Sequence, residues 1–441
     1  MGKKVALHNL GCKVNAYETE AIEQMLEKEG YQMVPFAPGA DVYIINTCTV
    51  TNIADRKSRQ MLHKAKKMNP KALVVAIGCY VQAAGKELEK DPSIDLVIGN
   101  NKKKDLIAIL KSWESGMKQE EEILDISRVR EYENLSIDKT LEHTRAYIKV
   151  QDGCNQFCSY CIIPYTRGRV RSRRQEEVVA EVERLAGKGC LEVVLTGIHL
   201  SSYGIDLGSN LLELILAVHQ VEGIQRIRLG SLEPRIVTEE FVKTISKLPK
   251  ICPHFHLSLQ SGCDTTLKRM NRRYTTEEYL EKCQLLRRYF SHPAFTTDVI
   301  VGFPGESEEE FLETVAFLKT IRFYETHVFK YSRRIGTKAA EMPDQVPDPI
   351  KAKRSAVLLS LCAEYKQKFE RALIGTETEI LFEEEVCLQG EFFWVGHTKE
   401  YVKLATRSAE NLENRLTRVT VTGDQVQGIP ICQISTHQKM N

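Results

Sequence analysis

Three cysteines stand close together in the middle of the chain. The segment 153–161, GCNQFCSYC, places Cys154, Cys158 and Cys161 in a CxxxCxxC spacing. Three thiolates on one short loop can bind three irons of a four-iron cluster and leave the fourth iron without a protein ligand. The amino and carboxylate groups of S-adenosylmethionine can chelate such an open iron, and one electron from the cluster then breaks a carbon–sulfur bond to release a 5′-deoxyadenosyl radical. The spacing therefore predicts a radical-generating iron–sulfur site.

A structural zinc site is the competing interpretation of these three cysteines. Structural zinc takes four protein ligands, and no His follows the motif at the spacing of a zinc finger. The motif also comes directly after an expected barrel strand at 146–150, where barrel enzymes carry their chemistry. Both observations favour the cluster.

A second set of three cysteines is spread over the first hundred residues. Cys12, Cys48 and Cys79 each stand just past a short apolar run that is followed by a segment of helical period. Strands that alternate with helices indicate a parallel sheet, whose carboxyl ends share one edge, so these three thiols are expected to converge there as ligands of an auxiliary [4Fe–4S] cluster. Each alone is also compatible with a buried thiol. The apolar runs cover residues 5–7, 42–45 and 73–77.

The strands that must position these cysteines divide the chain into parts. We predict an α/β multidomain protein, with a parallel βα sheet domain at 1–115, a linker at 116–140 with a strand at 123–126, a partial (βα)6 barrel at 141–372 and a small antiparallel, OB-like β-barrel at 373–441. The expected barrel strands are 146–150, 192–195, 226–229, 255–259, 297–301 and 327–331. The expected C-terminal strands are 378–382, 392–395, 401–404 and 418–421.

Composition sets limits on the protein class. A formal net charge of +2 over 441 residues is too small for overall charge to drive nucleic-acid binding. Thirteen cysteines, an odd number, fit metal ligands and buried thiols better than a disulfide framework. With neither an apolar run of membrane-spanning length nor a secretory leader, the sequence predicts a cytoplasmic protein without membrane contact. For the cysteines outside the two sets we expect buried thiols: Cys190, Cys252, Cys263, Cys283, Cys362, Cys387 and Cys432.

Over nearly its whole length the chain resembles the radical S-adenosylmethionine methylthiotransferases. Its three parts resemble that family's auxiliary-cluster domain, radical-cluster barrel and RNA-binding TRAM domain. The segments 11–15, GCKVN, and 167–173, RGRVRSR, are similar to the MtaB-like branch, which modifies N6-threonylcarbamoyladenosine beside the tRNA anticodon. The resemblance implies two [4Fe–4S] clusters and two S-adenosylmethionine molecules per turnover, one to methylate the sulfur and one to generate the radical.

The resemblance also implies the substrate and the partners. The expected product is the 2-methylthio derivative of N6-threonylcarbamoyladenosine at tRNA position 37, and the catalytic residues are the six cluster cysteines. The C2 hydrogen of adenine is far too weakly acidic for a side-chain base, which makes homolytic abstraction the expected route. Expected partners are a tRNA anticodon stem-loop, an electron donor and a sulfur source, with a monomer as the favoured state.

Residues at other strand ends are expected to contact the cofactor or the substrate. Polar strand-end residues also serve as turn formers and caps, which is the alternative for each. His254 and His256 share a strand face, and we assign them no metal. The expected cofactor contacts are Thr196, Gly197, Glu233, Ser258, Gln260, Asp298 and Gly302.

Basic residues near the radical motif and in the last domain are expected to contact tRNA. Charge runs are ordinarily solvated, but this one follows the cluster loop directly. In the last domain, aromatic side chains would add stacking to the charged contacts, although its start is acidic. The expected contacts are Arg167, Arg169, Arg171, Arg173 and Arg174 near the motif, and Trp394, His397, Lys399, Lys403, Arg407, Arg415 and Arg418 in the last domain.

Three alternatives to this function stay open. Within the same chemistry, the target could be isopentenyladenosine in tRNA or a ribosomal-protein side chain. Outside it, the same cysteines and terminal barrel could form a zinc-bearing RNA-binding protein without catalysis. Six βα units argue against the last alternative, because a pure binding module has no need of them.

Overall fold

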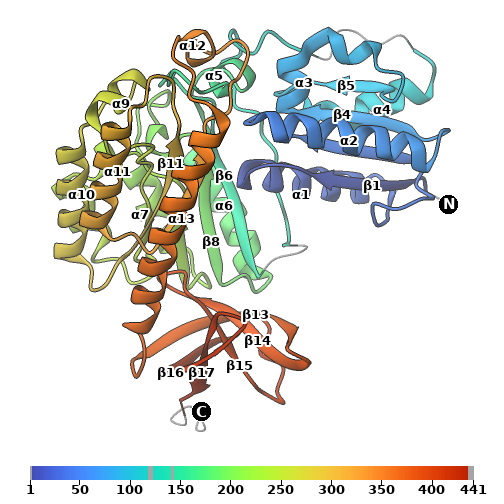
Figure 1. Ribbon diagram of the computed structural model, residues 1–441. Helices are drawn as coiled ribbons and strands as arrows, with labels where there is room; N and C mark the ends of the chain where they lie inside the picture. The colour runs from blue at the N-terminus through green and yellow to red at the C-terminus, as the bar shows by residue number, and fades with distance from the viewer. Residues whose placement is uncertain (1, 118–122, 141–143, 436–441) are drawn as a thin grey trace.

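A computed structural model describes residues 2–117, 123–140 and 144–435 of the chain. It has a parallel sheet domain at the N-terminus, a central barrel beside it and a small β-barrel at the far end of the central barrel (Figure 1). This architecture confirms the predicted fold class. Among the described residues, no helix is both long and apolar enough to cross a membrane.

The N-terminal sheet is parallel throughout, in the order β2-β1-β3-β4-β5. Its central strand, β3, is buried along its whole length, as expected for a parallel strand covered by helices on both faces. One face packs on α1 and α4 and the other on α2 and α3. The elements are β1 Lys4–Asn9, α1 Lys13–Lys28, β2 Gln32–Met33, β3 Val42–Thr47, α2 Asn52–Met68, β4 Leu73–Gly78, α3 Cys79–Ala84, η1 Gly85–Lys90, β5 Leu96–Ile98, η2 Lys103–Asp105 and α4 Leu106–Glu114.

The segment 123–140 contains no strand, so the strand predicted at 123–126 is wrong. Three of its apolar residues are buried separately: Ile126 lies against Gly168, and Leu135 and Ile137 join the core of the central barrel. Single side chains buried in this way need no neighbouring strand, so the apolar run in this segment does not form the backbone hydrogen bonds of a β-sheet. Residues 118–122 of the expected linker, 141–143 at the start of the expected barrel and 436–441 of the expected last domain lie outside the described residues.

The central barrel has six parallel strands in sequence order, β6, β8, β9, β10, β11 and β12. Isolated bridges from Ile227 to Ile251 and from Leu232 to Leu257 join β9 to β10. In the described part of the chain β12 pairs with β11 alone and the outer partner of β6 is the short antiparallel β7, so the barrel is open, as predicted. The strands are β6 Arg145–Asp152, β7 Arg171–Ser172, β8 Glu192–Gly197, β9 Arg226–Leu229, β10 His254–His256, β11 Ala294–Val301 and β12 Glu325–Lys330.

Helices cover the outside of this barrel, and one long helix leads out of it. The helix α13 runs along β12 and carries the chain to the last domain (Figure 1). The helical elements are α5 Ile163–Thr166, α6 Gln175–Gly187, η3 Leu200–Ser202, α7 Leu211–Gln220, η4 Pro234–Ile236, α8 Glu239–Ile245, α9 Asp264–Arg269, α10 Thr276–Tyr289, α11 Glu308–Ile321, α12 Lys338–Glu341 and α13 Asp348–Arg371.

The C-terminal barrel is closed, in the order β13-β14-β15-β17-β16. The four strands predicted from the sequence are present, and a fifth, β17, completes the closure through a parallel pair between Ala405 and Ile431. Closure leaves no long strand edge exposed. The strands are β13 Glu377–Leu388, β14 Glu391–Thr398, β15 Lys403–Thr406, β16 Leu416–Val426 and β17 Ile429–Ile434.

Candidate active site

The three N-terminal cysteines follow three neighbouring strands of the sheet. Cys12 comes after β1, Cys48 follows β3 directly and Cys79 begins α3 at the end of β4. The first two loops touch, because a Cβ placed on Gly11, whose φ is +111°, would lie 3.0 Å from the Cys48 sulfur. A cavity of about 380 Å³ opens beside Cys12 and Cys48. Burial raises the pKa of Cys48 to about 11, and the nearby thiols of Cys79 and Cys12 contribute to the increase.

Hydrogen-bond donors point at the sulfur of Cys79. Arg167 Nε donates to Cys79 Sγ at 3.2 Å, and Asn100 Nδ2 donates to the same sulfur at 3.7 Å. Both donors are buried. Donors of this kind stabilise an anionic sulfur and suit a metal-bound thiolate better than a neutral thiol. The environment of Cys79 thus fits a cluster ligand.

The loop that carries Cys154, Cys158 and Cys161 has a tightly fixed backbone. Gly153 has φ +70°, and a Cβ there would lie 1.9 Å from the carbonyl oxygen of Arg169, so only glycine fits. The Cys154 amide donates to the carbonyl of Gly168 at 3.0 Å. Asn271 Nδ2 donates to the carbonyls of residues 156 and 157 at 3.3 and 2.9 Å. These contacts hold the loop at the end of β6.

The sulfurs of this loop also receive hydrogen bonds. The Gln156 amide donates to Cys154 Sγ and Arg272 Nη1 donates to Cys158 Sγ, each at 3.4 Å. Burial raises the pKa of Cys154 to about 11 and that of Cys161 to about 12. Such thiols are protonated on their own, and a bound metal takes the place of the proton. The donor set therefore fits a cluster held by Cys154, Cys158 and Cys161.

A cavity of about 260 Å³ lies between the two cysteine sites. Val50 and Thr51, from the loop after Cys48, line one side of it. Cys161, Gln260 and Asp298 line the other. The cavity is therefore bounded by a segment adjoining each set of cysteines, and a group seated in it would be close to both.

Residues after β12 hold the Cys48 loop against the barrel. Arg334 is buried and donates to Thr49 Oγ1 at 2.6 Å and to Asn52 Oδ1 at 2.7 Å. It also pairs with Asp55 at 2.8 Å. The Asn52 amide donates to Ser332 Oγ at 3.1 Å. These contacts fix the position of the N-terminal domain at the barrel mouth.

The residues expected to contact the cofactor are distributed around this mouth. Gln260, with φ +71°, and Asp298 line the cavity beside Cys161. Glu233 accepts a hydrogen bond from Gln156 of the cluster loop at 3.2 Å, and the Ser258 carbonyl accepts one from Arg272 at 3.2 Å.

The remaining three expected contacts are held by protein groups. Thr196 and Gly197 end β8, where a Cβ on Gly197 would lie 2.9 Å from the Gln151 side chain. The Gly302 amide donates to Glu306 at 2.6 Å, and Lys351 covers its Cα, so this glycine serves close packing. The cofactor roles of all seven residues stay predictions.

The arginines after the cluster loop require a correction. Arg167, Arg171 and Arg173 are 0%, 0% and 2% exposed, so the predicted phosphate contacts do not form there. Arg167 pairs with Glu18 at 2.8 Å and with Asp152 at 3.2 Å, and Arg173 pairs with Glu181. Buried guanidinium groups need carboxylate partners, and these partners turn the side chains inward. Arg169 and Arg174 are exposed and stay predicted phosphate contacts.

Part of the expected tRNA surface of the last domain also faces inward. Trp394 is buried in the domain core, which removes it as a stacking platform. His397 pairs with Glu383 and stacks on Tyr401 with 4.5 Å between ring centroids. Lys399 Nζ donates to the Pro249 carbonyl at 3.1 Å.

The other expected contacts of that domain are nearer to solvent. Lys403 is half-buried, and its tRNA role stays a prediction. Exposed arginines there are Arg407, which pairs with Glu391, Arg415, which pairs with Glu410 at 3.4 Å, and Arg418.

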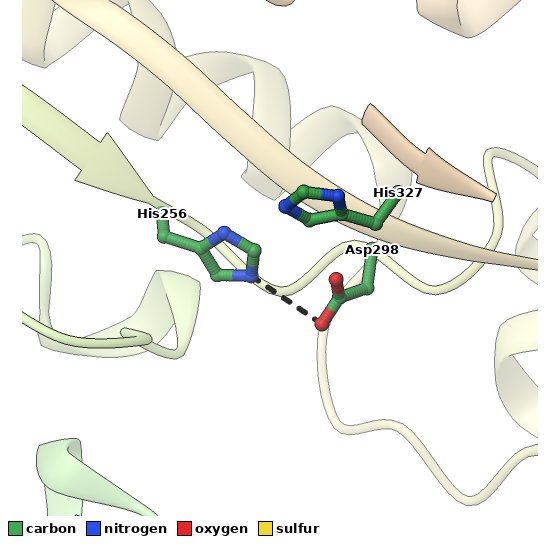
Figure 2. Close-up of side chains that lie close together, drawn as sticks. All are labelled: His256, Asp298 and His327. Atoms are coloured by element: carbon green, nitrogen blue, oxygen red, sulfur yellow. Dashed lines mark ion pairs between the residues drawn. The ribbon is translucent and has the colours of Figure 1, made fainter. Parts of the chain in front are cut away.

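The lumen of the central barrel holds a cluster in which His327 joins two residues named from the sequence, His256 and Asp298. His256 Nε2 lies 3.4 Å from Asp298 Oδ2, and the His256 and His327 rings are stacked with centroids 6.1 Å apart. Figure 2 shows the three side chains directed toward one another from neighbouring strands. One ligand atom from each lies within 4.8 Å of the other two. His254 donates to or accepts from Thr296 Oγ1 at 3.1 Å on the same face.

Several residues of the site were missed because they act from a distance in sequence. Arg272 lies 114 positions after Cys158, and Asn100 lies 21 positions after Cys79. The available signals were weak: Asn100 closely follows β5, and Tyr331 and Ser332 follow β12 and line the cavity. The sequence could predict that these residues lie at strand ends, but it could not predict their contacts.

Comparison with known proteins agrees with this arrangement. Residues 148–318 match the Radical SAM superfamily, and residues 4–99 match the Uncharacterized protein family UPF0004. The structure of the radical S-adenosylmethionine methyltransferase TsrM from Kitasatospora setae, which has cobalamin and a [4Fe–4S] cluster bound, superposes with a TM-score of 0.58 at 16% identity, over 77% of each chain. At that identity the likeness concerns the fold.

Similarity to curated proteins extends over almost the whole chain. The threonylcarbamoyladenosine tRNA methylthiotransferase MtaB of Bacillus subtilis is 40% identical, over 95% of this chain and 93% of that protein. The protein of the same name from Aquifex aeolicus is 44% identical, over 87% and 93%. The tRNA-2-methylthio-N(6)-dimethylallyladenosine synthase of Pelotomaculum thermopropionicum is 34% identical over 99% of both chains. The chain therefore belongs to the MtaB-like radical S-adenosylmethionine methylthiotransferases, enzymes that methylthiolate tRNA with S-adenosylmethionine and [4Fe–4S] clusters.

Proposed function

We propose that this enzyme converts N6-threonylcarbamoyladenosine at position 37 of tRNA to its 2-methylthio derivative. The choice of substrate rests on the relatives named MtaB, which are 36 to 44% identical, whereas the dimethylallyladenosine synthases are 34 to 37% identical. The assignment of the reacting centre rests on one observation, the cavity that Val50 and Thr51 share with Cys161. A single base in that cavity would lie between a radical source and a sulfur carrier.

The six cysteines would hold two [4Fe–4S] clusters. Cys154, Cys158 and Cys161 would bind one, and Cys12, Cys48 and Cys79 the other, each with one iron left free of protein ligands. When bound, the first cluster with S-adenosylmethionine supplies the radical and the second carries the sulfur to be transferred. Arg272, the Gln156 amide, Asn100 and Arg167 would stabilise the negative charge on the ligand sulfurs through the hydrogen bonds described above.

The other residues of the mouth would position the reactants. Gln260 and Asp298 would hold the base or the cofactor beside Cys161, because their side chains share its cavity. Glu233 is a carboxylate at neutral pH: although burial opposes ionisation, the hydrogen bonds from His199 and Arg235 lower its pKa to about 2. It would orient the cofactor through Gln156, with Thr196, Gly197 and Ser258 on the neighbouring strand ends.

The anticodon stem-loop would approach the open side of the mouth. Exposed Arg169 follows the cluster loop and α5, and Lys403 lies on the C-terminal barrel, so both would contact phosphates. The reaction also consumes electrons and sulfur, which an electron donor and a sulfur source must supply. We infer that the enzyme is cytoplasmic, since tRNA and reductant are available there. We also infer that it acts as a monomer.

Two cysteine variants test the division of labour. In anaerobically prepared Cys48→Ala enzyme, methylthiolation should be lost while 5′-deoxyadenosine is still formed from S-adenosylmethionine. In Cys158→Ala both activities should be lost, because the radical cluster is disrupted. The wild-type enzyme should contain about eight irons per chain. Zinc in place of iron, or loss of 5′-deoxyadenosine in the first variant, would contradict the proposal.

The substrate is tested on tRNA nucleosides. Mass spectrometry of tRNA from a strain that lacks this enzyme should show N6-threonylcarbamoyladenosine without its 2-methylthio form, and the wild-type gene should restore that form. Loss of methylthio-isopentenyladenosine instead would assign the enzyme to the other nucleoside. Unchanged tRNA with a changed ribosomal protein would move it to the protein-directed branch.

A further inference from the structure

Three polar side chains, His256, Asp298 and His327, lie close together inside the barrel, next to the cavity beside the radical cluster. The part of the lumen that they line is called the recess. Asp298 belongs to both: it lines that cavity with Cys161 and also forms the cluster with His256 and His327. His327 is exposed although it lies on a barrel strand, so water reaches this part of the lumen. The recess therefore shares Asp298 with the reacting-centre cavity.

One histidine of the recess, His256, has a buried ring nitrogen that makes no hydrogen bond within the described residues. His256 Nδ1 is engaged with Thr296 Oγ1 at 3.0 Å, which fixes the ring and leaves Nε2 toward Asp298. His256 Nε2 is enclosed; it makes no hydrogen bond among the described residues, and its contact with Asp298 at 3.4 Å is an ion pair only when the ring is protonated. An enclosed polar atom without a partner is costly, and a polar group of a ligand placed there would remove that cost.

Lys13 brings a positive charge from the N-terminal domain into the recess. It follows Cys12 at the start of α1, and its ammonium lies 6.0 Å from the centroid of the Tyr147 ring, on the lumen side of β6. Burial and the charge of Arg228 lower the pKa of Lys13, whereas Asp298 raises it, which places the ammonium among the lumen groups. It forms no ion pair with any residue that the structure describes.

The other cations of the lumen already have partners. Arg228 Nε donates to Glu192 at 2.9 Å, and Arg145 pairs with Glu383 at 3.0 Å. Lys13, in contrast, has no ion-pair partner within the described part of the chain and remains available to a ligand. Because its charge acts on both Asp298 and His254, an anionic group is the ligand that the recess favours.

Two histidines and one carboxylate can also bind a transition metal. The positive charges of Lys13 and Arg228 act on this part of the lumen, and a divalent cation would add a further positive charge to them. The charge distribution therefore favours an organic anion over a metal ion.

We propose that the recess binds the amino-acid arm of the substrate nucleoside, with Lys13 paired to its carboxylate and His256, Asp298 and His327 hydrogen-bonded to its hydroxyl and urea groups. This inference rests on the function proposed above. An apolar isopentenyl arm would leave these polar groups unpaired, and sites of that kind reject an analogue that lacks the polar group. The recess would then select the threonylcarbamoyl nucleoside.

A binding experiment with a modified ligand tests the Lys13 contact. The probe is a tRNA anticodon stem-loop carrying either N6-threonylcarbamoyladenosine or its carboxylate methyl ester, titrated into anaerobic holoenzyme without reductant so that no turnover occurs. Wild-type enzyme should bind the free acid at least tenfold more tightly than the ester. In Lys13→Met this preference should fall to within twofold, because the ester and the variant remove the same contact.

Control variants keep the result interpretable. Lys13→Arg should retain most of the preference, since the charge is kept. Lys28→Met, at the other end of α1 where the exposed Lys28 pairs with Asp138, should bind both stem-loops as the wild type does. The iron content of Lys13→Met should match that of the wild type, which shows that the cluster site at the neighbouring Cys12 is intact. Unchanged 5′-deoxyadenosine formation shows the same for the radical cluster.

Three other results would distinguish a wrong recess inference from a wrong proposed function or a metal site. If wild-type enzyme methylthiolates the threonylcarbamoyl stem-loop but Lys13→Met keeps the full acid preference, the recess inference is wrong and the proposed substrate stands. If wild-type enzyme modifies only isopentenyladenosine, the proposed function itself fails. A non-iron metal present in wild-type holoenzyme and absent from His327→Ala would overturn the inference in favour of a metal site.

Discussion

Two junctions join the central barrel to its neighbours, and both are built from charged side chains. At the N-terminal junction Glu18 of α1 accepts hydrogen bonds from Lys103, Lys149 and Arg167, all at 2.7 to 2.8 Å. Each of these side chains is at most 1% exposed. Although burial opposes it, the three positive charges hold the pKa of Glu18 well below its usual value. No water competes for these contacts.

The C-terminal junction is more open. Arg226 and Arg145 of the barrel pair with Glu379 and Glu383, which are 39% and 20% exposed. Between them the Tyr401 ring lies 4.9 Å from the Arg145 guanidinium. Partly solvated pairs are screened, so each contributes less than a buried pair and costs less when lost.

The more deeply buried junction is the one that lies nearer to the cysteine sites. The buried junction includes Arg167, whose Nε donates a hydrogen bond to the sulfur of Cys79. Its Nη1 donates to Asp152, at the end of the strand β6 that precedes the radical-cluster loop. The relative position of the two cysteine sites is thus fixed by buried charged side chains that have few other hydrogen-bond partners within reach. The open junction lies at the other end of the barrel and holds the last domain in place (Figure 1).

The largest expected effect comes from breaking the buried junction. Arg167→Met should lower the free energy of unfolding by about 3 to 5 kcal/mol, because it removes one partner from a buried charge network. Urea unfolding under anaerobic conditions measures the loss. The matched control is Arg174→Met, seven residues on and exposed, which should change stability by less than about 0.5 kcal/mol. Equal midpoints for the two variants would show that the network is dispensable.

At the open junction Tyr401→Ala should have a smaller effect. The Tyr401 ring lies 4.6 Å from the Arg228 guanidinium and stacks on His397, and losing these contacts should cost about 1 to 3 kcal/mol. Faster limited proteolysis between α13 and β13 would report loosening of the last domain. Phe392→Ala, in the same domain but 65% exposed, is the control and should leave the rate unchanged. If both variants behave alike, Tyr401 does not anchor the domain.

Acid should weaken the open junction. Burial, with the charges of Arg228, Lys13, His256 and His397, lowers the pKa of His254 well below its usual 6.5, so the ring is neutral in the folded state. Below pH 6.5 the unfolded chain binds a proton that the folded chain does not. As the pH is lowered, the free energy of unfolding therefore decreases by up to about 1.4 kcal/mol per pH unit, until the folded-state pKa of His254 is reached.

The pH dependence is read from urea midpoints between pH 8 and 5.5. His254→Gln should reduce the slope below pH 6.5, since the titrating group is gone. A slope that is unaffected by His254→Gln would assign the acid sensitivity to other groups.

Local signals made the elements of the fold predictable. The cysteine spacing at 154–161 and the buried run of β3 need no knowledge of distant residues. Strand β17 was missed because IPICQI is short and contains Pro430, which cannot donate to a ladder. Its place is set by closure of the barrel, which is a property of the whole domain.

The burial of the arginines could not be predicted in the same way. Arg167 lies 149 positions from Glu18, and a charge run near a cluster loop has the same sequence whether it faces phosphate or a buried carboxylate. The lumen cluster of His256, Asp298 and His327 depends likewise on the register of three strands. Tertiary pairing decided both, and sequence spacing carried no signal of it.

The smallest effect on stability is expected at the surface of the radical loop. Exposed Arg169 lies 4.6 Å from the Phe157 ring, so Arg169→Ala should cost at most about 1 kcal/mol. Its effect should appear in tRNA binding instead: affinity should fall, and the slope of log K against log salt should decrease by about 1, because one phosphate contact is lost. Arg288→Ala, at an exposed site on α10, should leave that slope unchanged. An unchanged slope for Arg169→Ala would place the tRNA backbone away from the loop and leave the C-terminal barrel as its main contact.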